Sequence, residues 1–258
     1  MTKYMKRKEL EQHLQELEGF SKPKILLEQY ITSSHIAACM LHTIESAYGD
    51  LYQKTVLDLG CGGSVLGIGS VLLGASFVLG VDIDEEALQI STSNISQFEL
   101  SEINLLQADV KLLPQILEGT KKFDTVIMNP PFGTKHNKGL DSLFLEIGLQ
   151  CLSDKGVLYS LHKSSTRDYF HRKAPGWRVD ARVLAELRYD LPATYKFHNK
   201  SSVDIKRTIG VAAEPTTSIT SDNALGLADT SSARIAGSLL ESSEAGISKV
   251  FPGAKASY

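Results

Sequence analysis

The chain has 258 residues, of which 42% are hydrophobic and 22% are charged, a composition typical of a soluble globular protein. Its net charge of −3 excludes an overall electrostatic grip on nucleic acid, so any such binding must come from local clusters of basic residues. No apolar stretch reaches the roughly 20 residues of a membrane span. The three cysteines form no CxxC pair, which argues against a disulfide framework or a zinc site and favours a reducing compartment, the nucleus and cytoplasm.

The amino-terminal part of the chain predicts a helical cap. Apolar residues recur at helical spacing between residues 6 and 18, and Gly19 is placed to end that helix. Ser33 or Ser34 can cap a second helix that follows. We expect residues 1–50 to contribute this cap to a cofactor and RNA site.

From residue 55 onward, apolar strand patterns alternate with amphipathic helices. Strands are expected at residues 55–59, 77–81, 103–108, 123–128, 156–161 and 177–187. Helices are expected at residues 65–73, 84–98, 112–117, 141–152 and 164–173. Such alternation predicts a Rossmann-like α/β core over residues 51–210, with a mostly parallel sheet, helices on both faces and ligands beyond the carboxyl ends of the strands.

The last part of the chain has a different composition. From about residue 212 it is rich in Ser, Ala, Gly and Thr, and aromatic residues are nearly absent. Such a segment buries too little apolar surface to offset its ordering entropy. The composition therefore predicts a low-complexity, disordered tail over residues 211–258.

A glycine loop follows the first strand, in the segment Asp58-Leu-Gly60-Cys-Gly62-Gly63-Ser64. Glycines let the backbone turn tightly and pass close to a ligand, and the next helix offers N–H groups to an anion. The spacing is not the G-x-G-x-x-G of a pyrophosphate loop. Asp58 would repel a pyrophosphate but could attract an ammonium group. A ligand with a carboxylate, an ammonium and a sulfonium is S-adenosylmethionine (SAM), although a glycine turn that merely packs stays open for this motif alone.

Acidic residues stand at two further strand ends. Asp82 follows the second strand, where a carboxylate can bind both ribose hydroxyls. Asp109 follows the third strand and is placed to accept from an adenine amino group, with Val110 beside the ring. One acid at a strand end is usually a turn residue. Three at successive strand ends, with Asn129 at the fourth, favour a binding site.

The tetrapeptide Asn129-Pro130-Pro131-Phe132 at the end of the fourth strand is the candidate catalytic motif. The side-chain oxygen of Asn129 and the carbonyl of Pro130 can both accept hydrogen bonds from one planar NH2 group. Each proline fixes φ and restricts the preceding residue, which stiffens the backbone that aims these acceptors. Phe132 offers a face for stacking, worth roughly 1–3 kcal/mol for a base.

Basic residues gather in the loops at the same strand ends. Each cluster alone is more often a solvated surface, but their grouping favours RNA binding. The candidate RNA-binding residues are Lys135, Lys138, Lys163, Arg167, Lys196, His198 and Lys200. Basic residues His136 and His162 stand beside them in the sequence.

Several segments together resemble the methyltransferase-like protein 5 family, eukaryotic SAM-dependent enzymes that make N6-methyladenosine in small-subunit ribosomal RNA. The resemblance covers roughly residues 5–205. It rests on Leu-Leu-Glu-Gln29-Tyr30-x-Thr32, Asp58-Leu-Gly-Cys-Gly, Asp82-Ile-Asp-Glu, Val126-Ile-Met-Asn-Pro-Pro-Phe-Gly-Thr-Lys135, Ser160-Leu-His-Lys-Ser-Ser-Thr-Arg167, Ala185-Glu-Leu-Arg-Tyr-Asp-Leu-Pro192 and Tyr195-Lys-Phe-His-x-Lys200.

The resemblance implies which residues surround SAM and which partner the enzyme has. The implied SAM residues are Gln29, Thr32, Gly60, Gly63, Val65, Asp82, Asp109 and Val110. The implied partner is a small zinc-ribbon methyltransferase activator subunit, which forms a heterodimer with the enzyme and stabilises it by covering its sheet.

Two features depart from the family pattern. Ser64 stands where the family usually has a glycine, and we expect its N–H still to face the ligand. The segment after Ile205 differs from the apolar strand that ends the family domain, so we expect a final strand that is cut short.

Two other functions stay open at this point. Motifs of the form Asn-Pro-Pro-aromatic also serve protein-glutamine N5-methyltransferases, although those usually have Tyr in place of Phe132. The chain could also be an inactive protein that binds SAM or RNA.

Overall fold

The computed structural model describes residues 5–132, 137–192 and 202–215. Within this part of the chain the strands form one sheet in the order β3-β2-β1-β4-β5-β7-β6. The strands are β1 (Thr55–Leu59), β2 (Phe77–Asp82), β3 (Ile103–Gln107), β4 (Phe123–Met128), β5 (Leu152–Lys163), β6 (Val179–Pro192) and β7 (Ser202–Pro215). Neighbouring strands from β3 to β5 run parallel, and β7 is antiparallel to both β5 and β6.

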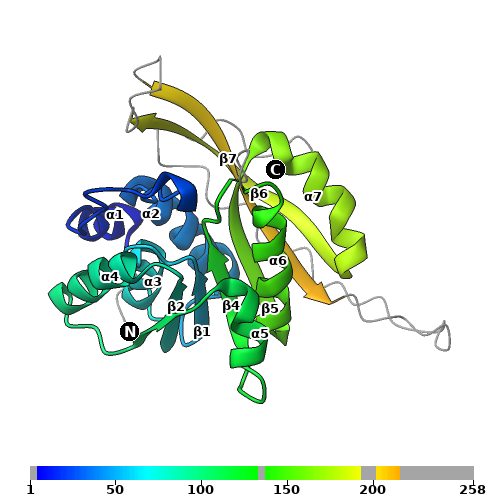
Figure 1. Cartoon of the computed structure of the whole chain (residues 1–258), viewed down its shortest axis with the longest axis horizontal. Coiled ribbons are helices and arrows are strands. Elements are labelled where there is room, and N and C mark those ends of the chain that lie inside the picture. Colours follow the sequence, from blue (N-terminus) through cyan, green and yellow to red (C-terminus); the bar gives the residue numbers. More distant parts are fainter. Residues whose placement is uncertain (1–4, 133–136, 193–201, 216–258) are drawn as a thin grey trace, which may run out of the picture.

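Helices cover both faces of this sheet, so the predicted fold class is confirmed (Figure 1). The α-helices are α1 (Arg7–Gln15), α2 (Ser34–Thr43), α3 (Val65–Leu72), α4 (Glu85–Gln97), α5 (Leu113–Ile116), α6 (Leu140–Cys151) and α7 (Arg167–Lys173). In Figure 1, helices α1 to α4 lie on one side of the sheet and α5 to α7 on the other. No helix among the described residues is long and apolar enough to cross a membrane.

The two faces of the sheet carry separate hydrophobic clusters because side chains alternate along a strand. Val56 of β1 packs in the cluster that α1, α2 and α3 cover. Its neighbour Leu57 packs in the cluster that α5 and α6 cover. Both clusters consist mostly of aliphatic side chains that are almost fully buried, and the burial of this apolar surface provides most of the favourable free energy of folding.

Local signals set the starts of the two helices that flank the site. The Ser33 hydroxyl accepts from the N–H of Ile36 at 3.3 Å, so the expected cap of α2 is confirmed. Asp84 accepts from the N–H of Glu86 at 3.3 Å and caps α4. The first helix ends at Gln15, before the glycine that was expected to end it.

The final strand is not cut short, contrary to the sequence-based expectation. β7 pairs with β6 from Ser202 to Pro215 and with β5 over its central part. Strand pairing uses backbone N–H and C=O groups, so a change of side chains after Ile205 does not abolish it. The expected core boundary at residue 210 therefore falls inside β7. From residue 216 onward the expected tail lies outside the described residues.

Candidate active site

A cavity of about 210 Å³ lies at the carboxyl ends of β1, β2, β3 and β4. Its remaining walls come from residues 26–30, which include the short helix η1 (Ile25–Leu27), and from the start of α6. The cavity brings together eight residues that the sequence predicted for one site: Gln29, Gly60, Gly62, Asp82, Asp109, Val110, Asn129 and Pro131.

Two glycines let the backbone of the loop after β1 form part of the cavity wall. Gly60 and Gly62 have φ values of 71° and 54°, a region that residues with a side chain seldom adopt. A Cβ at Gly60 would also lie 3.1 Å from Cε1 of Phe144, which closes the far side of the cavity. A side chain at this position would therefore narrow the space for a ligand.

Asp82 joins the glycine loop to the end of β2. One of its carboxylate oxygens accepts from the N–H of Gly62 at 2.9 Å, and the other accepts from the N–H of Asp84 at 3.0 Å. Burial raises the pKa of this carboxyl above its usual value. Each carboxylate oxygen has more than one lone pair, so the same group can also accept from the two hydroxyls of a ribose.

Asp109 lines the cavity and caps a turn at the same time. Its carboxylate accepts from the N–H of Lys111 at 3.0 Å, at the start of the short helix η3 (Val110–Leu112). Val110 is buried and offers an apolar surface to the cavity beside this carboxylate. The pair therefore combines an acceptor and an apolar contact, as a purine ring requires.

Asp58 does not line the cavity, although the sequence assigned it to the ammonium group of the ligand. It is 1% exposed, and its Oδ2 accepts from the N–H of Gly67 in α3 at 2.9 Å. Asp58 shares a strand face with Val56, which α3 covers, and this alternation turns it away from the cavity. Burial, with a further contribution from nearby Asp82, raises the pKa of its carboxyl to about 7.

The cavity wall also does not include Gly63 and Ser64 of the glycine loop, or Val65, the first residue of α3. The carbonyl of Gly63 accepts from the Asn94 side chain at 2.9 Å, and Val65 is buried in the core beneath α2. The N–H of Ser64 donates to the carbonyl of Cys61 at 2.8 Å, which corrects the expectation that it faces the ligand. A tight turn between Cys61 and Ser64, with Ser64 at a φ of 59°, takes up this donor.

Gln29 lines the cavity and fastens the amino-terminal segment, residues 24–32, to the loop after β2. Its side-chain nitrogen donates to Asp84 at 2.6 Å, and its side-chain oxygen accepts from the N–H of Lys24 at 2.8 Å. The ammonium of Lys24 also contacts Asp84 at 2.6 Å. These bonds place residues 26–30 over the carboxyl ends of the strands.

The same amino-terminal segment holds the tetrapeptide in place. The side-chain nitrogen of Asn129 donates to the hydroxyl of Thr32 at 2.8 Å. The N–H of Phe132 donates to the Glu28 carboxylate at 2.7 Å. Thr32 is not part of the cavity wall itself but positions Asn129, which is. The sequence analysis gave Glu28 no role, because a pair of residues so far apart in the chain leaves no local signal.

The prolines and the aromatic ring of the tetrapeptide differ in exposure. Pro131 lines the cavity, whereas Pro130 is buried. The ring of Phe132 lies 6.1 Å from the ring of Tyr30, centroid to centroid. Tyr30 is itself part of the cavity wall, so Phe132 stands just outside it.

The structure describes three of the residues that the sequence assigned to RNA. Lys138 is exposed, and the Nζ of Lys163 lies 4.9 Å from the centroid of the Phe132 ring. Arg167 forms an ion pair with Glu186, which offsets its charge. The other four, Lys135, Lys196, His198 and Lys200, lie outside the described residues.

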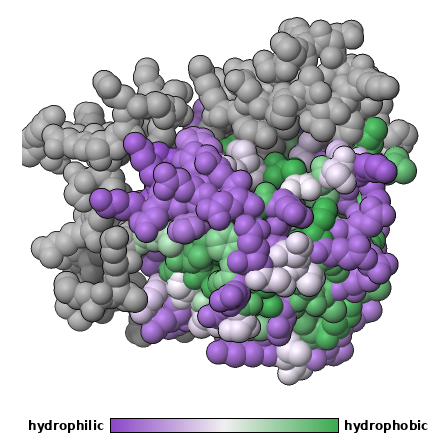
Figure 2. Space-filling view, turned by 90° about the vertical axis from the view of Figure 1, so that its left-hand side faces the viewer, coloured by the Kyte–Doolittle hydropathy of each residue, from purple (hydrophilic) through white to green (hydrophobic). Residues whose placement is uncertain are grey.

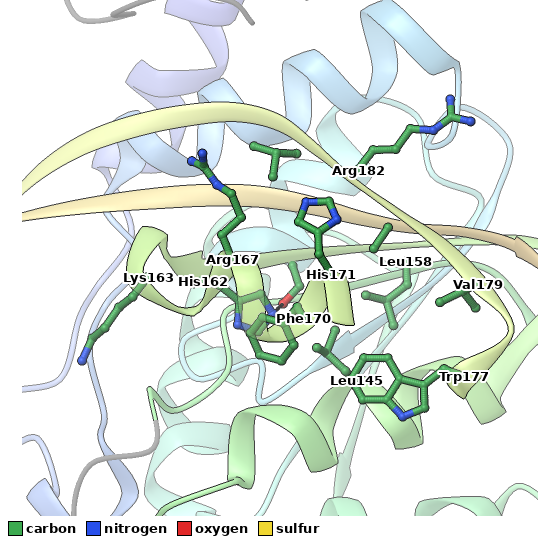
Figure 3. A pocket seen from close by; sticks show the side chains of 13 residues that line it. Leu145, Leu158, His162, Lys163, Arg167, Phe170, His171, Trp177, Val179 and Arg182 are labelled. Carbon is green, nitrogen blue, oxygen red and sulfur yellow. Dashed lines mark hydrogen bonds between the residues drawn. The ribbon is translucent and has the colours of Figure 1, made fainter. Parts of the chain in front are cut away.

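A second, smaller cavity of about 60 Å³ lies between α7 and the sheet (Figure 3). Phe170, Trp177 and Leu145 make most of its wall apolar, and among the described residues its lining includes no part of the glycine loop. His162 lies in this wall, and burial lowers its pKa to about 3, so it is neutral near pH 7 and adds no positive charge to an RNA surface. Lys163 also contributes to the wall of this cavity, and in Figure 3 its side chain extends away from Phe170 and Trp177.

Comparisons with known proteins agree with this geometry. Residues 34–130 match the family model of ribosomal protein L11 methyltransferase (PrmA). The crystal structure of PH1948 from Pyrococcus horikoshii, a candidate RNA methyltransferase, superimposes on this chain with a TM-score of 0.70 and 32% identity. The match covers 82% of this chain and 98% of PH1948.

Curated relatives match over nearly their full length. The rRNA N(6)-adenosine-methyltransferase METTL5 of Danio rerio is 55% identical over 202 residues, which cover 78% of this chain and 96% of the relative. The Drosophila melanogaster enzyme of the same name is 49% identical over 203 residues, which cover 78% of this chain and 93% of the relative. The chain therefore belongs to the METTL5 family of rRNA N(6)-adenosine-methyltransferases.

Proposed function

We propose that this protein transfers the methyl group of SAM to the N6 amino group of an unpaired adenosine in small-subunit ribosomal RNA. The observation that carries the proposal is that Asn129 shares one cavity with Asp82 and Gly60. An acceptor for an amino group thus lies in the same space as the carboxylate and the glycine backbone that suit a nucleoside cofactor.

The residues of the cavity fit SAM by the chemistry of their groups. The carboxylate of Asp82 suits the ribose hydroxyls, and Asp109 with Val110 suits the adenine ring. Gly60 and Gly62 leave room for the methionine part of the molecule, and the carboxylate end of that part can approach the loop backbone. When bound, SAM supplies an electrophilic methyl group on its sulfonium sulfur.

Asn129 and Pro130 would make the target nitrogen more nucleophilic. The lone pair of the adenine amino group is delocalised into the ring, which makes it a poor nucleophile. Hydrogen bonds from its two N–H groups to the Asn129 oxygen and the Pro130 carbonyl would localise the lone pair. Positioning of this kind can contribute several kcal/mol, up to roughly 7–11 in the best intramolecular models. The methylated nitrogen is acidic and loses its proton to water, so no dedicated base is required.

RNA must present this adenine unpaired or flipped out of a helix, because pairing would occupy its amino group. Phe132 supports this mode of binding, since its ring stands at the edge of the cavity beside Tyr30. Lys163 lies against the same ring, where its charge can attract the phosphate next to the stacked base.

We further propose that a zinc-ribbon activator subunit binds along the free edge of β3. Within the described residues β3 ends the sheet, and an edge strand carries backbone groups that can pair with another chain. Leu112 and Ile116, which follow β3, are 50% and 47% exposed. Apolar surface is visible among polar patches on the side of the molecule that Figure 2 shows. An edge with exposed apolar side chains fits a permanent partner.

Labelled methyl transfer tests the proposed reaction. The protein is incubated with labelled SAM and a mixture of ribosomal RNA and ribosomal protein, with and without the activator subunit. RNase or protease digestion then separates the possible products, and mass spectrometry identifies them. We expect N6-methyladenosine, and more of it with the activator. Label in a glutamine side chain, with none in RNA, would contradict the proposal and favour protein methylation instead.

A further inference from the structure

Glu28 is a buried acid with an unusual backbone conformation. It follows η1 with φ 50° and ψ 43°, in the left-handed region that residues with a side chain seldom adopt. It is only 6% exposed. Such a backbone conformation costs free energy and persists only where the surrounding structure enforces it, which happens most often at functional sites. Glu28 lines the cavity, so it is a candidate for a functional role.

The carboxylate of Glu28 accepts hydrogen bonds at two points of the chain, one at the end of the tetrapeptide and one shortly after it. One oxygen accepts from the N–H of Phe132 at 2.7 Å, and the other accepts from the side-chain nitrogen of Asn137 at 3.1 Å. Asn137 also donates to the carbonyl of Leu26 at 2.9 Å. Residues 132 and 137 are thereby tied to one residue of the amino-terminal segment.

A carboxylate suits this task better than a neutral side chain. Ionised acceptors form shorter and stronger hydrogen bonds with backbone N–H groups than neutral acceptors do. Two donors also converge on one group, and only a carboxylate offers an acceptor oxygen to each without presenting a donor of its own.

We propose that Glu28 is a positioning residue for methyl transfer, which fixes Phe132 and through it the direction of the Asn129 acceptor. This inference rests on the function proposed above. The left-handed turn at Glu28 places its carboxylate under the tetrapeptide, and the rigid prolines transmit that position to Asn129. Glu28 itself does not exchange a proton with the substrate.

Positioning has a recognisable kinetic signature. A displacement of about 1 Å at the reacting groups can reduce turnover about 100-fold while binding changes little. Glu28→Ala should therefore lower kcat about 100-fold, with a SAM dissociation constant within about threefold of that of the native protein. Glu28→Gln keeps one acceptor for Phe132 but turns an NH2 group toward Asn137, so it should lower kcat only about 10-fold.

Matched measurements separate positioning from general damage. The full chain with Glu99→Gln serves as the control, because Glu99 also has a left-handed φ of 53° but is exposed and follows the carboxyl end of α4. It should retain native kcat. The amide proton of Phe132, measured by NMR without RNA, should move upfield in Glu28→Gln as its hydrogen bond weakens. This shift reports on Glu28 even if the methyl acceptor proves not to be RNA.

Two results would overturn the proposal. One is native kcat in both Glu28 variants. The other is a loss of SAM affinity and of melting temperature in proportion to the loss of kcat, which would show that Glu28 only maintains the fold. Loss of kcat with retained SAM binding, a graded effect from Gln to Ala and a shifted Phe132 amide would support it.

Discussion

The side-chain nitrogen of Asn129 donates to the hydroxyl of Thr32 at 2.8 Å, across 97 positions of the sequence. Because the nitrogen of the amide donates to Thr32, the oxygen of the amide lies on the other side of the side-chain end. An acceptor at the cavity wall is what an amino group needs. In the proposed function, the amino-terminal segment therefore determines which end of the Asn129 amide meets the substrate.

Replacing Thr32 by Val removes this partner while nearly keeping the shape of the side chain. The amide of Asn129 can then rotate and present its nitrogen to the cavity. We expect Thr32→Val to lower kcat about 10-fold, the effect of losing roughly one neutral hydrogen bond, and to change SAM affinity little. Steady-state kinetics with calorimetry of SAM binding checks this. Unchanged kcat would mean that Thr32 does not orient the amide.

Asp82 and Asp58 should differ sharply in their effect on SAM. Asp82 lines the cavity, so Asp82→Asn should weaken SAM binding about 10- to 100-fold through loss of charged hydrogen bonds to the ribose. Asp58 is buried against α3, so Asp58→Asn should change SAM affinity by less than about threefold. Calorimetric titration of both variants measures the contrast. Equal losses would restore the sequence-based role of Asp58.

Asp58 should also make stability depend on pH. Its carboxyl has a pKa of about 7 in the folded protein and 3.8 as its ordinary value. Between these values the folded protein keeps a proton that the unfolded chain has released, so the free energy of unfolding falls as pH rises from about 4 to about 7.

Denaturant unfolding at pH 5.5 and pH 8 tests this dependence. Asn at position 58 is neutral at both pH values, so the Asp58→Asn variant should lose less stability over the interval than the native protein, by on the order of 1–2 kcal/mol. Other titrating groups are common to both proteins and cancel in the comparison. Parallel losses in the two proteins would contradict the raised pKa of Asp58.

Lys163 should contribute electrostatically to RNA binding. Lys163→Ala should weaken RNA binding. It should also reduce the slope of log affinity against log salt concentration by about one, the change expected when one phosphate contact is lost. Lys155, at the opposite end of β5 and exposed, provides the matched control, since Lys155→Ala should leave both quantities unchanged. Binding measured at several salt concentrations gives the slopes. Identical slopes for the two variants would remove Lys163 from the RNA surface.

The sequence predicted the core strands well because the signals for them are local. The expected bounds of β1 and β4 match the structure, since short apolar runs between polar turns define them. The sequence also predicted that Asp82, Asp109 and Asn129 share one site, because the carboxyl ends of parallel strands meet at the same edge of a sheet. The prediction that the final strand is cut short was wrong. Side-chain composition says little about backbone pairing, and β7 pairs with both β5 and β6.

The parts of the site that were missed depend on tertiary packing. The direction of Asp58 is set by which face of β1 is covered by α3, and its place beside the glycine loop in the sequence favoured the opposite choice. The bonds of Thr32 and Glu28 to the tetrapeptide join segments about 100 residues apart, and no local pattern predicts them. RNA binding by Arg167 stays a prediction, but its ion pair with Glu186 was not expected, because that pair depends on where α7 packs against β6.

Turnover of Asn129→Ala, measured beside its affinity for SAM, tests the central claim most directly. If Asn129 activates the adenine amino group, the variant binds SAM within about threefold of the native affinity and loses methyl transfer at least about 100-fold. Methyl transfer to RNA at the native rate, or loss of SAM binding together with turnover, would contradict the role of Asn129.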